Sequence, residues 1–239
     1  MSYFQPHATA ANSDHRSRDA LRMDPASSLR AGFCIDSDAA NVRERAAKLT
    51  ARLRQPRDQA RRIFDYVRDH IRYNFAPDVR DRRDFKASHV LEIGNGFCMQ
   101  KAALFAALCR ASGVPARIGF QNLVDYKITG RFRELMRTNE LHGHGMNAVY
   151  LDGRWLAVDC TLDHTLVERK NYRLVEFDGQ RDALLPATDR AGLPHFTILQ
   201  QRGFYNDTPL FAIRTMLRWI AEVPYEDWKR LVHRQHGSM

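Results

Sequence analysis

The chain has 239 residues, a formal net charge of +9 and 44% hydrophobic residues. This size and hydrophobicity suit a globular protein with a well-formed core, and no run of 18 or more apolar residues is present to cross a membrane. Four cysteines without a CxxC pair, and an N-terminus without the apolar stretch of a signal peptide, lead us to expect reduced thiols and a cytoplasmic protein. We expect a polar, disordered tail over residues 1–30 and a single domain over residues 31–239.

Most of the excess positive charge lies in one segment, residues 43–86, which contains 14 Lys or Arg and 7 Asp or Glu. The apolar residues around and within this segment recur at helical spacing and predict two amphipathic helices. Their stripes are Val42, Ala46, Leu49 and Leu53, then Ala60, Ile63, Phe64, Val67 and Ile71. Arginines opposite such stripes, with acidic residues interleaved, are typical of a solvated helix face. No nucleic-acid-binding motif accompanies them, so we do not expect nucleic acid as a partner.

A cysteine lies between a glycine-containing turn and a long apolar stretch in GNGFCMQKAALFAALCRASGVP, residues 94–115. The stretch after Cys98 is apolar around most of its circumference, which predicts a buried helix that ends at Gly113. A thiol in the first turn lies at the positive end of the helix dipole, where unpaired backbone N–H groups favour the thiolate and can bind an oxyanion. A lone cysteine is more often a small buried hydrophobe, so Cys98 needs partners elsewhere in the chain.

After a short strand-like run at residues 116–120, a β-hairpin gives the clearest strand signal. MNAVYL and RWLAVDC are joined by an Asp-Gly pair, which favours a two-residue type I′ turn. With that turn, facing residues have numbers that sum to 305, so Met146 faces Asp159. His144 shares the face of Met146 and lies diagonal to Asp159, whereas His142 lies further along the strand and is a poorer partner.

Cys98, His144 and Asp159 together have the chemistry of a Cys-His-Asp acyl-transfer site. The carboxylate would orient the imidazole and favour imidazolium, which in turn would favour the thiolate. The spacing is equally compatible with a core cysteine and a separate His–Asp pair on a surface hairpin. The His and Cys residues lack zinc-ligand spacing, so we expect no metal, and we expect no cofactor. Tyr73 and Asn74 are further candidates for the border of the site.

The segments GFCMQKAALFAALCRASGVPAR and HGMNAVYLDGRWLAVDCTLD resemble the core of the transglutaminase-like superfamily of papain-like cysteine enzymes. The resemblance covers roughly residues 60–163 as a catalytic core. It departs from the family pattern at Met146, where Trp is usual, and at Cys160, where Pro is common. Carried over by position, Cys98 matches the nucleophile, His144 the base and Asp159 the orienting carboxylate.

The resemblance implies an α+β papain-like fold, in which a helical part that carries the cysteine packs on an antiparallel sheet that carries the histidine and the aspartate. It also implies acyl transfer from an amide or thioester carbonyl of a peptide, protein or small molecule. The acceptor is water in a protease or amidase, and an amine in a transglutaminase or amide-forming acyltransferase. The sequence does not choose between these acceptors and leaves the oligomeric state open. A catalytically silent binding module of the same fold is the alternative.

Residues 164–239 carry weaker signals. Residues 167–179, VERKNYRLVEFDG, predict a strand pair, and Phe196–Leu199 a further short strand. Leu210–Ile220 predicts an amphipathic helix and Tyr225–Val232 a second helical segment. We expect these C-terminal strands and helices to belong to the single domain, with the apolar stripe of the first helix packed in the core or as a lid rather than anchored in a membrane.

Overall fold

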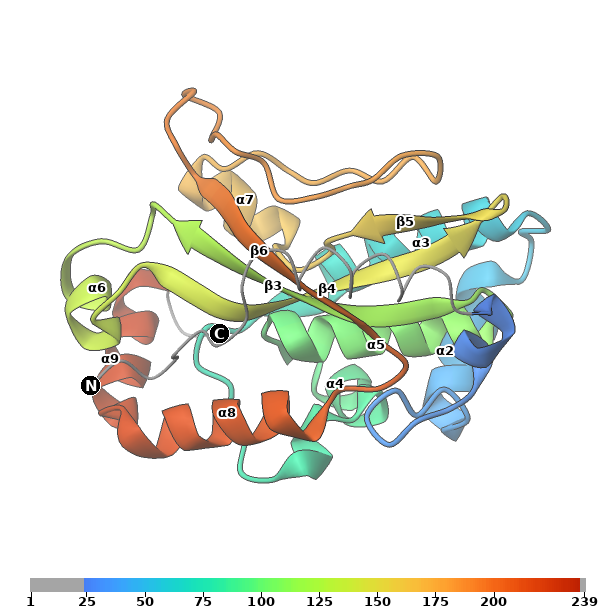
Figure 1. The fold of residues 1–239 in the computed structure, drawn as a ribbon, viewed down its shortest axis with the longest axis horizontal. Coiled ribbons are helices and arrows are strands. Elements are labelled where there is room, and N and C mark those ends of the chain that lie inside the picture. The colour runs from blue at the N-terminus through green and yellow to red at the C-terminus, as the bar shows by residue number, and fades with distance from the viewer. Residues whose placement is uncertain (1–23, 237–239) are drawn as a thin grey trace.

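The computed structural model describes residues 24–236. Its main sheet has four strands in the order β5-β4-β3-β6, and all three neighbouring pairs are antiparallel. The strands are β3 (Ala116–Asp125), β4 (Glu140–Leu151), β5 (Arg154–Val158) and β6 (Phe196–Tyr205). Helices pack on one face of this sheet (Figure 1). The expected α+β class, with a helical part on an antiparallel sheet, is confirmed.

The helical layer is organised around α5 (Cys98–Ala111), which contacts β3 and β4 on one side and three other helices on the other. Those helices are α2 (Ala40–Thr50), α3 (Pro56–His70) and α4 (Ala87–Ile93). Every residue of α5 from Met99 to Arg110 is buried, because the helix is apolar on nearly all sides. Gly113, at φ 81°, follows the helix in the left-handed region, so the expected helix end is confirmed.

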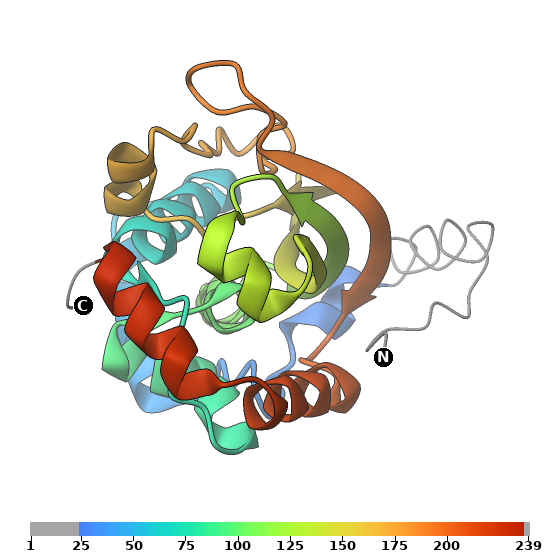
Figure 2. The same ribbon diagram turned by 90° about the vertical axis from the view of Figure 1, so that its left-hand side faces the viewer.

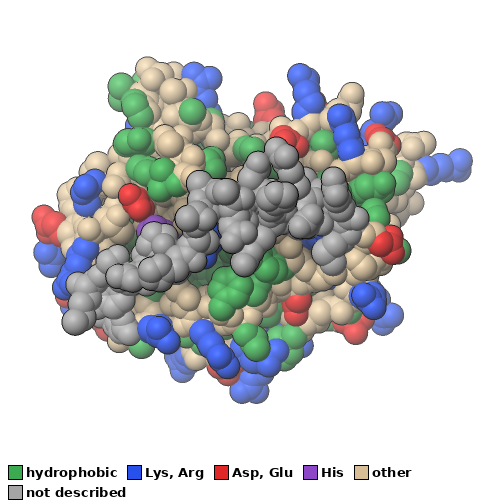
Figure 3. Space-filling view, viewed as in Figure 1, with side chains coloured by type: hydrophobic (Ala, Val, Ile, Leu, Met, Phe, Trp, Pro, Cys, Tyr) green, Lys and Arg blue, Asp and Glu red, His purple; other side chains and the backbone are tan. Residues whose placement is uncertain are grey.

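The two amphipathic helices predicted from the charged segment are α2 and α3. Their stripes are buried at Val42 and Ala46 and at Ala60, Ile63, Phe64 and Val67. The arginines of α3 are exposed except Arg68, which is buried and forms ion pairs with Asp69 at 2.6 Å and Asp65 at 3.2 Å. Figure 3 shows basic side chains at the edges of one face with acidic ones among them, as in a solvated charged surface.

The hairpin of β4 and β5 has the predicted register. The pairs run from Leu151 with Arg154 to Asn147 with Val158, each summing to 305. Both turn residues have positive φ, 48° at Asp152 and 81° at the following glycine, as a type I′ turn requires. The local turn chemistry therefore fixes how the two strands are aligned.

The remaining elements surround this core. They are two 3₁₀ helices, η1 (Pro25–Leu29) and η2 (Arg82–Phe85), a short parallel pair, β1 (Arg72–Tyr73) and β2 (Asn95–Gly96), and helices α6 (Gly130–Met136), α7 (His164–Lys170), α8 (Leu210–Glu222) and α9 (Tyr225–His236). Helix α6 lies in the connection between β3 and β4 and packs against α9 (Figure 2). No helix among residues 24–236 is both long and apolar enough to cross a membrane.

Two expectations need correction, and the first concerns the N-terminal tail. The predicted tail, residues 1–30, lies mostly outside the described residues, but its last part is ordered as η1. Ser28 is fully buried there, donates a hydrogen bond to Asn206 Oδ1 at 2.9 Å and accepts one from Arg117 Nε at 2.7 Å. These tertiary contacts, rather than any local periodicity, order the segment.

The strand pair predicted over residues 167–179 is wrong. Helix α7 occupies its first part, because the side chain of Asp163 caps it by accepting from the N–H of Leu166 at 2.8 Å. Asn171 then ends α7 at φ 56°. The short strand predicted at Phe196–Leu199 exists, but it extends to Tyr205 because it pairs with β3 along its length.

Candidate active site

Cys98 is the first residue of α5 and is partly exposed, unlike the other three thiols. Those three are at most 1% exposed. Burial raises the pKa of Cys34 and of Cys160 to about 12 and raises that of Cys109 well above its ordinary value. Cys98 is therefore the one cysteine of the chain that combines solvent access with a helix N-terminus.

His144, in β4, and Asp159, just after β5, are in direct contact. His144 Nε2 lies 2.7 Å from Asp159 Oδ2, and the two residues are 6% and 1% exposed. The other carboxylate oxygen of Asp159 accepts from both the backbone N–H and the hydroxyl of Thr161, at 3.1 and 2.5 Å. The carboxylate is thus fixed in place, and it holds the imidazole by one ring nitrogen.

The pKa of His144 is raised to about 10. Burial alone would lower it, but the charge of Asp159 and that of Cys98, together with hydrogen bonding to both groups, outweigh burial. These two partners therefore favour the protonated form of the ring. Because Asp159 occupies Nε2, the remaining ring nitrogen for Cys98 is Nδ1.

A glycine brings β4 onto the first turn of α5. A Cβ atom at Gly145 would lie 2.8 Å from the Cα of Met99 and 3.0 Å from the carbonyl carbon of Cys98, so no larger residue fits without moving backbone. Asn147 Nδ2 adds hydrogen bonds to the carbonyl oxygens of Ala102 and Arg117, at 2.9 and 3.0 Å. These contacts set His144 beside Cys98. The sequence analysis did not identify Gly145, whose only signal is a glycine inside a strand.

The short β1–β2 pair places Tyr73 beside the first turn of α5. Tyr73 pairs with Gly96, two residues before the cysteine, and its N–H donates to Asp163 Oδ2 at 2.7 Å. The backbone N–H of Cys98 faces the phenolic oxygen of Tyr73. The pKa of that phenol is raised well above its usual value, by burial and then by the charges of Cys98 and Asp159. The phenolic oxygen of Tyr73 therefore lies where the backbone N–H of Cys98, at the start of α5, can donate to it.

A buried lysine fixes the chain that carries Tyr73. Lys101 is fully buried in α5, and its Nζ donates to the carbonyl oxygens of Arg68 at 3.0 Å and Ile71 at 2.5 Å. These carbonyls lie at the end of α3 and just before β1, where helical partners are missing. Burial lowers the pKa of Lys101 to about 8.

Other candidates lie outside this cluster. His142 Nε2 lies 3.5 Å from the carboxylate of exposed Glu140. Asn74 donates to Asn95 Oδ1 at 2.9 Å and accepts from the N–H of Ala76 at 2.8 Å, so its amide serves the local turn. Within residues 24–236, no group of three or more His, Cys, Asp or Glu side chains is arranged to hold a metal ion.

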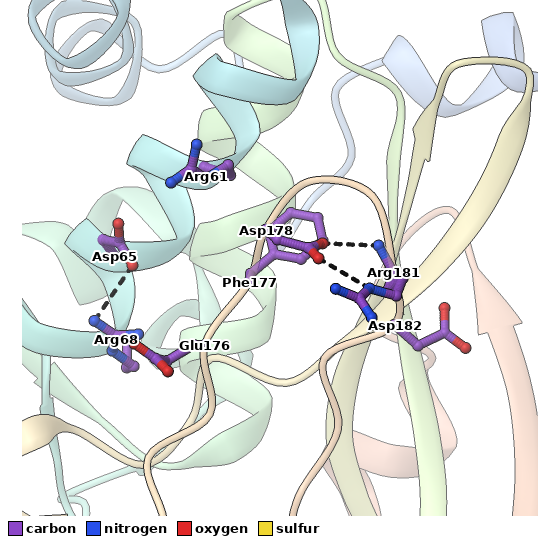
Figure 4. Close-up of a pocket in the computed structure, with 8 residues that line it drawn as sticks. All are labelled: Arg61, Asp65, Arg68, Glu176, Phe177, Asp178, Arg181 and Asp182. Carbon is purple, nitrogen blue, oxygen red and sulfur yellow. Dashed lines mark hydrogen bonds and ion pairs between the residues drawn. The ribbon is translucent and has the colours of Figure 1, made fainter.

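A hollow of about 660 Å³ lies on another part of the surface, between α3 and the segment 176–182 (Figure 4). It is lined by Arg61, Asp65, Arg68, Glu176, Phe177, Asp178, Arg181 and Asp182. Ion pairs join its opposite charges, including Arg181 with Asp178 at 3.1 Å. It contains none of the three candidate catalytic residues, and such a mixed charged lining is typical of solvated surface.

Two curated relatives and two solved structures are similar to parts of this chain. Kyphoscoliosis peptidase from Homo sapiens and that from Mus musculus are each 31% identical over 118 residues, or 46% of this chain and 16% of the relative. The chain thus matches only a small part of the length of these relatives. A solved structure of a candidate cysteine protease from Cytophaga hutchinsonii is 20% identical with a TM-score of 0.46, covering 77% of this chain and 55% of that one. The periplasmic domain of TgpA from Pseudomonas aeruginosa is 21% identical with a TM-score of 0.40, covering 58% and 48%.

The family model that matches is described as the transglutaminase-like superfamily, and it matches residues 43–160. That range includes Cys98, His144 and Asp159, as well as the contact of β4 with the first turn of α5. Through residues 43–160, the chain belongs to the transglutaminase-like superfamily.

Proposed function

We propose that this protein is a cysteine-dependent acyl-transfer enzyme, with Cys98 as nucleophile, His144 as general acid and base, and Asp159 as the residue that orients His144. The observation that carries the proposal is the contact of His144 Nε2 with the buried carboxylate of Asp159, 2.7 Å away, beside the first turn of α5. Burial would lower the pKa of His144, but the charges of Asp159 and Cys98 outweigh burial and raise it, which favours the imidazolium. A thiolate beside an imidazolium is the reactive form of such a pair.

The chemistry follows from this arrangement. The Cys98 thiolate attacks the carbonyl carbon of an amide or thioester, a C–S bond forms, and the carbonyl electron pair moves to oxygen. The backbone N–H of Cys98 stabilises that oxyanion once the carbonyl oxygen replaces the Tyr73 phenol as its neighbour. The imidazolium of His144 then gives its proton to the leaving nitrogen or sulfur, and an acyl-enzyme remains.

The second half of the reaction removes the acyl group and returns Cys98 and His144 to their starting states. Water or an amine attacks the acyl carbon, neutral His144 takes the proton of the attacking group, and the Cys98 thiolate leaves. With water the product is a carboxylic acid, and with an amine it is a new amide. The substrate is a peptide, a protein or a small molecule with an amide or thioester group.

The proposal is tested by the rate at which iodoacetamide alkylates Cys98 at neutral pH, followed by mass spectrometry of each cysteine peptide. Preference for Cys98 over the other cysteines is a weak test, because burial alone protects those three. The comparison that counts is between the wild type and His144→Ala. We expect the Cys98 rate to fall by roughly tenfold or more in the variant, because the thiolate loses its imidazolium.

The control is His142→Ala, which removes a histidine that lies on the same strand but pairs with Glu140. It should leave the Cys98 rate within about twofold of the wild type. Equal rates in the wild type and His144→Ala would show that Cys98 is an isolated thiol and would favour a catalytically silent module of this fold.

A further inference from the structure

Lys101 is a fully buried lysine, about one helical turn after Cys98 in α5. Its Nζ donates to two neutral oxygens, the backbone carbonyls of Arg68 at 3.0 Å and Ile71 at 2.5 Å. Full burial is unfavourable for a lysine side chain, and a lysine breaks the largely apolar pattern of this helix. Residues that break a local pattern in this way are expected mostly at functional sites.

The two carbonyl oxygens belong to the chain that leads into β1. Arg68 lies in the last turn of α3, where carbonyl oxygens lack helical partners, and Ile71 immediately precedes Arg72, the first residue of β1. Both contacts come from one side chain of α5. Lys101 therefore fixes the point at which the chain turns from α3 into β1.

Strand β1 in turn holds the segment that precedes Cys98. The N–H of Arg72 donates to the carbonyl of Gly94, and the N–H of Asn74 donates to the carbonyl of Gly96, each at 3.0 Å. Strand β2 ends at Gly96, two residues before Cys98. The contacts therefore form a closed circuit, which runs from α5 through the buried lysine to β1 and returns through β2 to the first residue of α5.

This circuit carries Tyr73. Strand β1 pairs Tyr73 with Gly96, so this tyrosine lies at the start of α5, and its N–H donates to Asp163 Oδ2 at 2.7 Å. In the proposed reaction, the substrate oxygen takes the place of the Tyr73 phenol beside the backbone N–H of Cys98. A shift of β1 would therefore change the space in which the oxyanion forms.

We infer that Lys101 is a positioning residue for the acylation step, which acts by holding β1 beside the first turn of α5. The inference rests on the proposed function of Cys98 and adds to it a residue that acts through the backbone. His144 does not depend on β1, because its partner Asp159 follows β5 and because β4 itself packs on α5. Loss of Lys101 should therefore disturb the oxyanion and leave the thiolate and its histidine in place.

Two reactions of the same thiol separate these effects in the full chain. Iodoacetamide is attacked at a saturated carbon, so a C–S bond forms, iodide leaves and no oxyanion arises. p-Nitrophenyl acetate is attacked at its carbonyl carbon, so an oxyanion forms before p-nitrophenolate leaves. The acylation rate, less that of Cys98→Ser, is divided by the alkylation rate of Cys98. This ratio cancels any change in the thiolate, because both reactions use it.

In Lys101→Met the ratio should fall by roughly ten- to hundredfold, because a displaced oxyanion is held less well by its donor. Arg110→Met is the matched control. Arg110 is a second buried cation of α5, and its guanidinium donates to the carbonyls of Ala116 at 2.9 Å and Asn206 at 2.8 Å, at the end of the helix away from Cys98. This variant should lose stability and keep the wild-type ratio.

Lys101→Gln provides the test if Lys101→Met does not fold. Its carboxamide keeps two N–H donors but ends closer to the backbone, so it too should lower the ratio, by a smaller factor. An unchanged ratio in the lysine variants, loss of the fold in both of them, or an equal fall in Arg110→Met would overturn the inference. A wild-type Cys98 that is alkylated but not acylated would also overturn it. If wild-type Cys98 is alkylated no faster than in His144→Ala, the proposed function fails instead.

Discussion

Two buried histidines of this protein have pKa values shifted in opposite directions. His144 is 6% exposed and lies 2.7 Å from Asp159, whereas His195 is fully buried and lies 4.0 Å from Asp125. The pKa of His144 is raised to about 10, and that of His195 is lowered to about 4. Burial opposes the proton at both sites. At His144, the carboxylate in direct contact and then the charge of Cys98 outweigh burial, whereas His195 has no carboxylate within hydrogen-bond distance.

The surroundings explain why one histidine suits chemistry and the other suits packing. The ring of His195 stacks on Phe196 at a centroid distance of 3.8 Å and lies 4.1 Å from Tyr172. Neither of its ring nitrogens has a hydrogen-bond partner among the described residues. His144 instead contacts the carboxylate of Asp159 and lies beside Cys98, a partly exposed thiol, as the proposed chemistry requires.

The largest effect is expected when the charged histidine is removed. His144→Ala should lower kcat/KM for an activated ester by roughly a thousandfold or more, because both the thiolate and the proton donor depend on it. His142→Ala should retain most of the activity, since His142 pairs with Glu140 instead. Comparable losses in the two variants would mean that the base is misassigned.

The next effect concerns pH. Because the pKa of His144 is raised, the imidazolium is present below about 10 and is lost as pH rises through that value. Turnover should therefore fall on the alkaline side near pH 10. Asp159→Asn should move this alkaline limb down towards 6.5, the ordinary value, and reduce the rate at neutral pH by roughly a hundredfold. A limb that stays in place would show that Asp159 does not hold the proton.

A smaller loss is expected from the backbone contact that places His144. Gly145→Ala puts a Cβ 2.8 Å from the Cα of Met99, so β4 must move away from the first turn of α5. We expect roughly a ten- to hundredfold loss of kcat/KM and about 1–3 kcal/mol of lost stability. In the control Gly96→Ala, the nearest neighbours of the new Cβ are side-chain atoms of Gln100 and Val90, at 3.0 Å or more, rather than backbone. Equal activity losses in the two variants would contradict the role of Gly145.

The smallest effect is a change in stability at the second histidine. The folded-state pKa of His195 lies below its unfolded value of 6.5, so the unfolded chain binds more protons as pH falls from 6.5 to about 4. His195 therefore destabilises the fold increasingly over that range. His195→Phe removes this penalty, and its free energy of unfolding should gain on the wild type as pH falls. Parallel curves for the two proteins would show that His195 is protonated in the fold.

The sequence was informative where the determining contacts are local. The all-round apolar pattern after Cys98 predicted a buried helix, and the Asp-Gly turn predicted the register that places His144 near Asp159. Both depend on neighbours in the chain. The helical stripes of α2 and α3 are of the same kind, since they depend only on residue spacing.

The parts of the fold and of the site that the sequence did not predict depend on contacts between segments far apart in the chain. Tyr73 reaches Cys98 only because β1 pairs with β2, and Gly145 matters only because Met99 packs on it. A strand pair was expected over residues 167–179, but the cap at Asp163 favours a helix over the first part of that range. Tertiary contacts thus determine the parts of the site that local patterns miss.

The most direct test is nitrogen-15 NMR of the histidine rings over a pH titration, with signals assigned from His144→Gln and His195→Phe. We expect both ring nitrogens of His144 to stay protonated until pH approaches 10, while His195 stays neutral down to about 4. In Cys98→Ser the pKa of His144 should fall, because the charge of Cys98 helps to raise it. A His144 that titrates near 6.5 and does not respond to Cys98→Ser would contradict the thiolate–imidazolium pair on which the proposed enzyme depends.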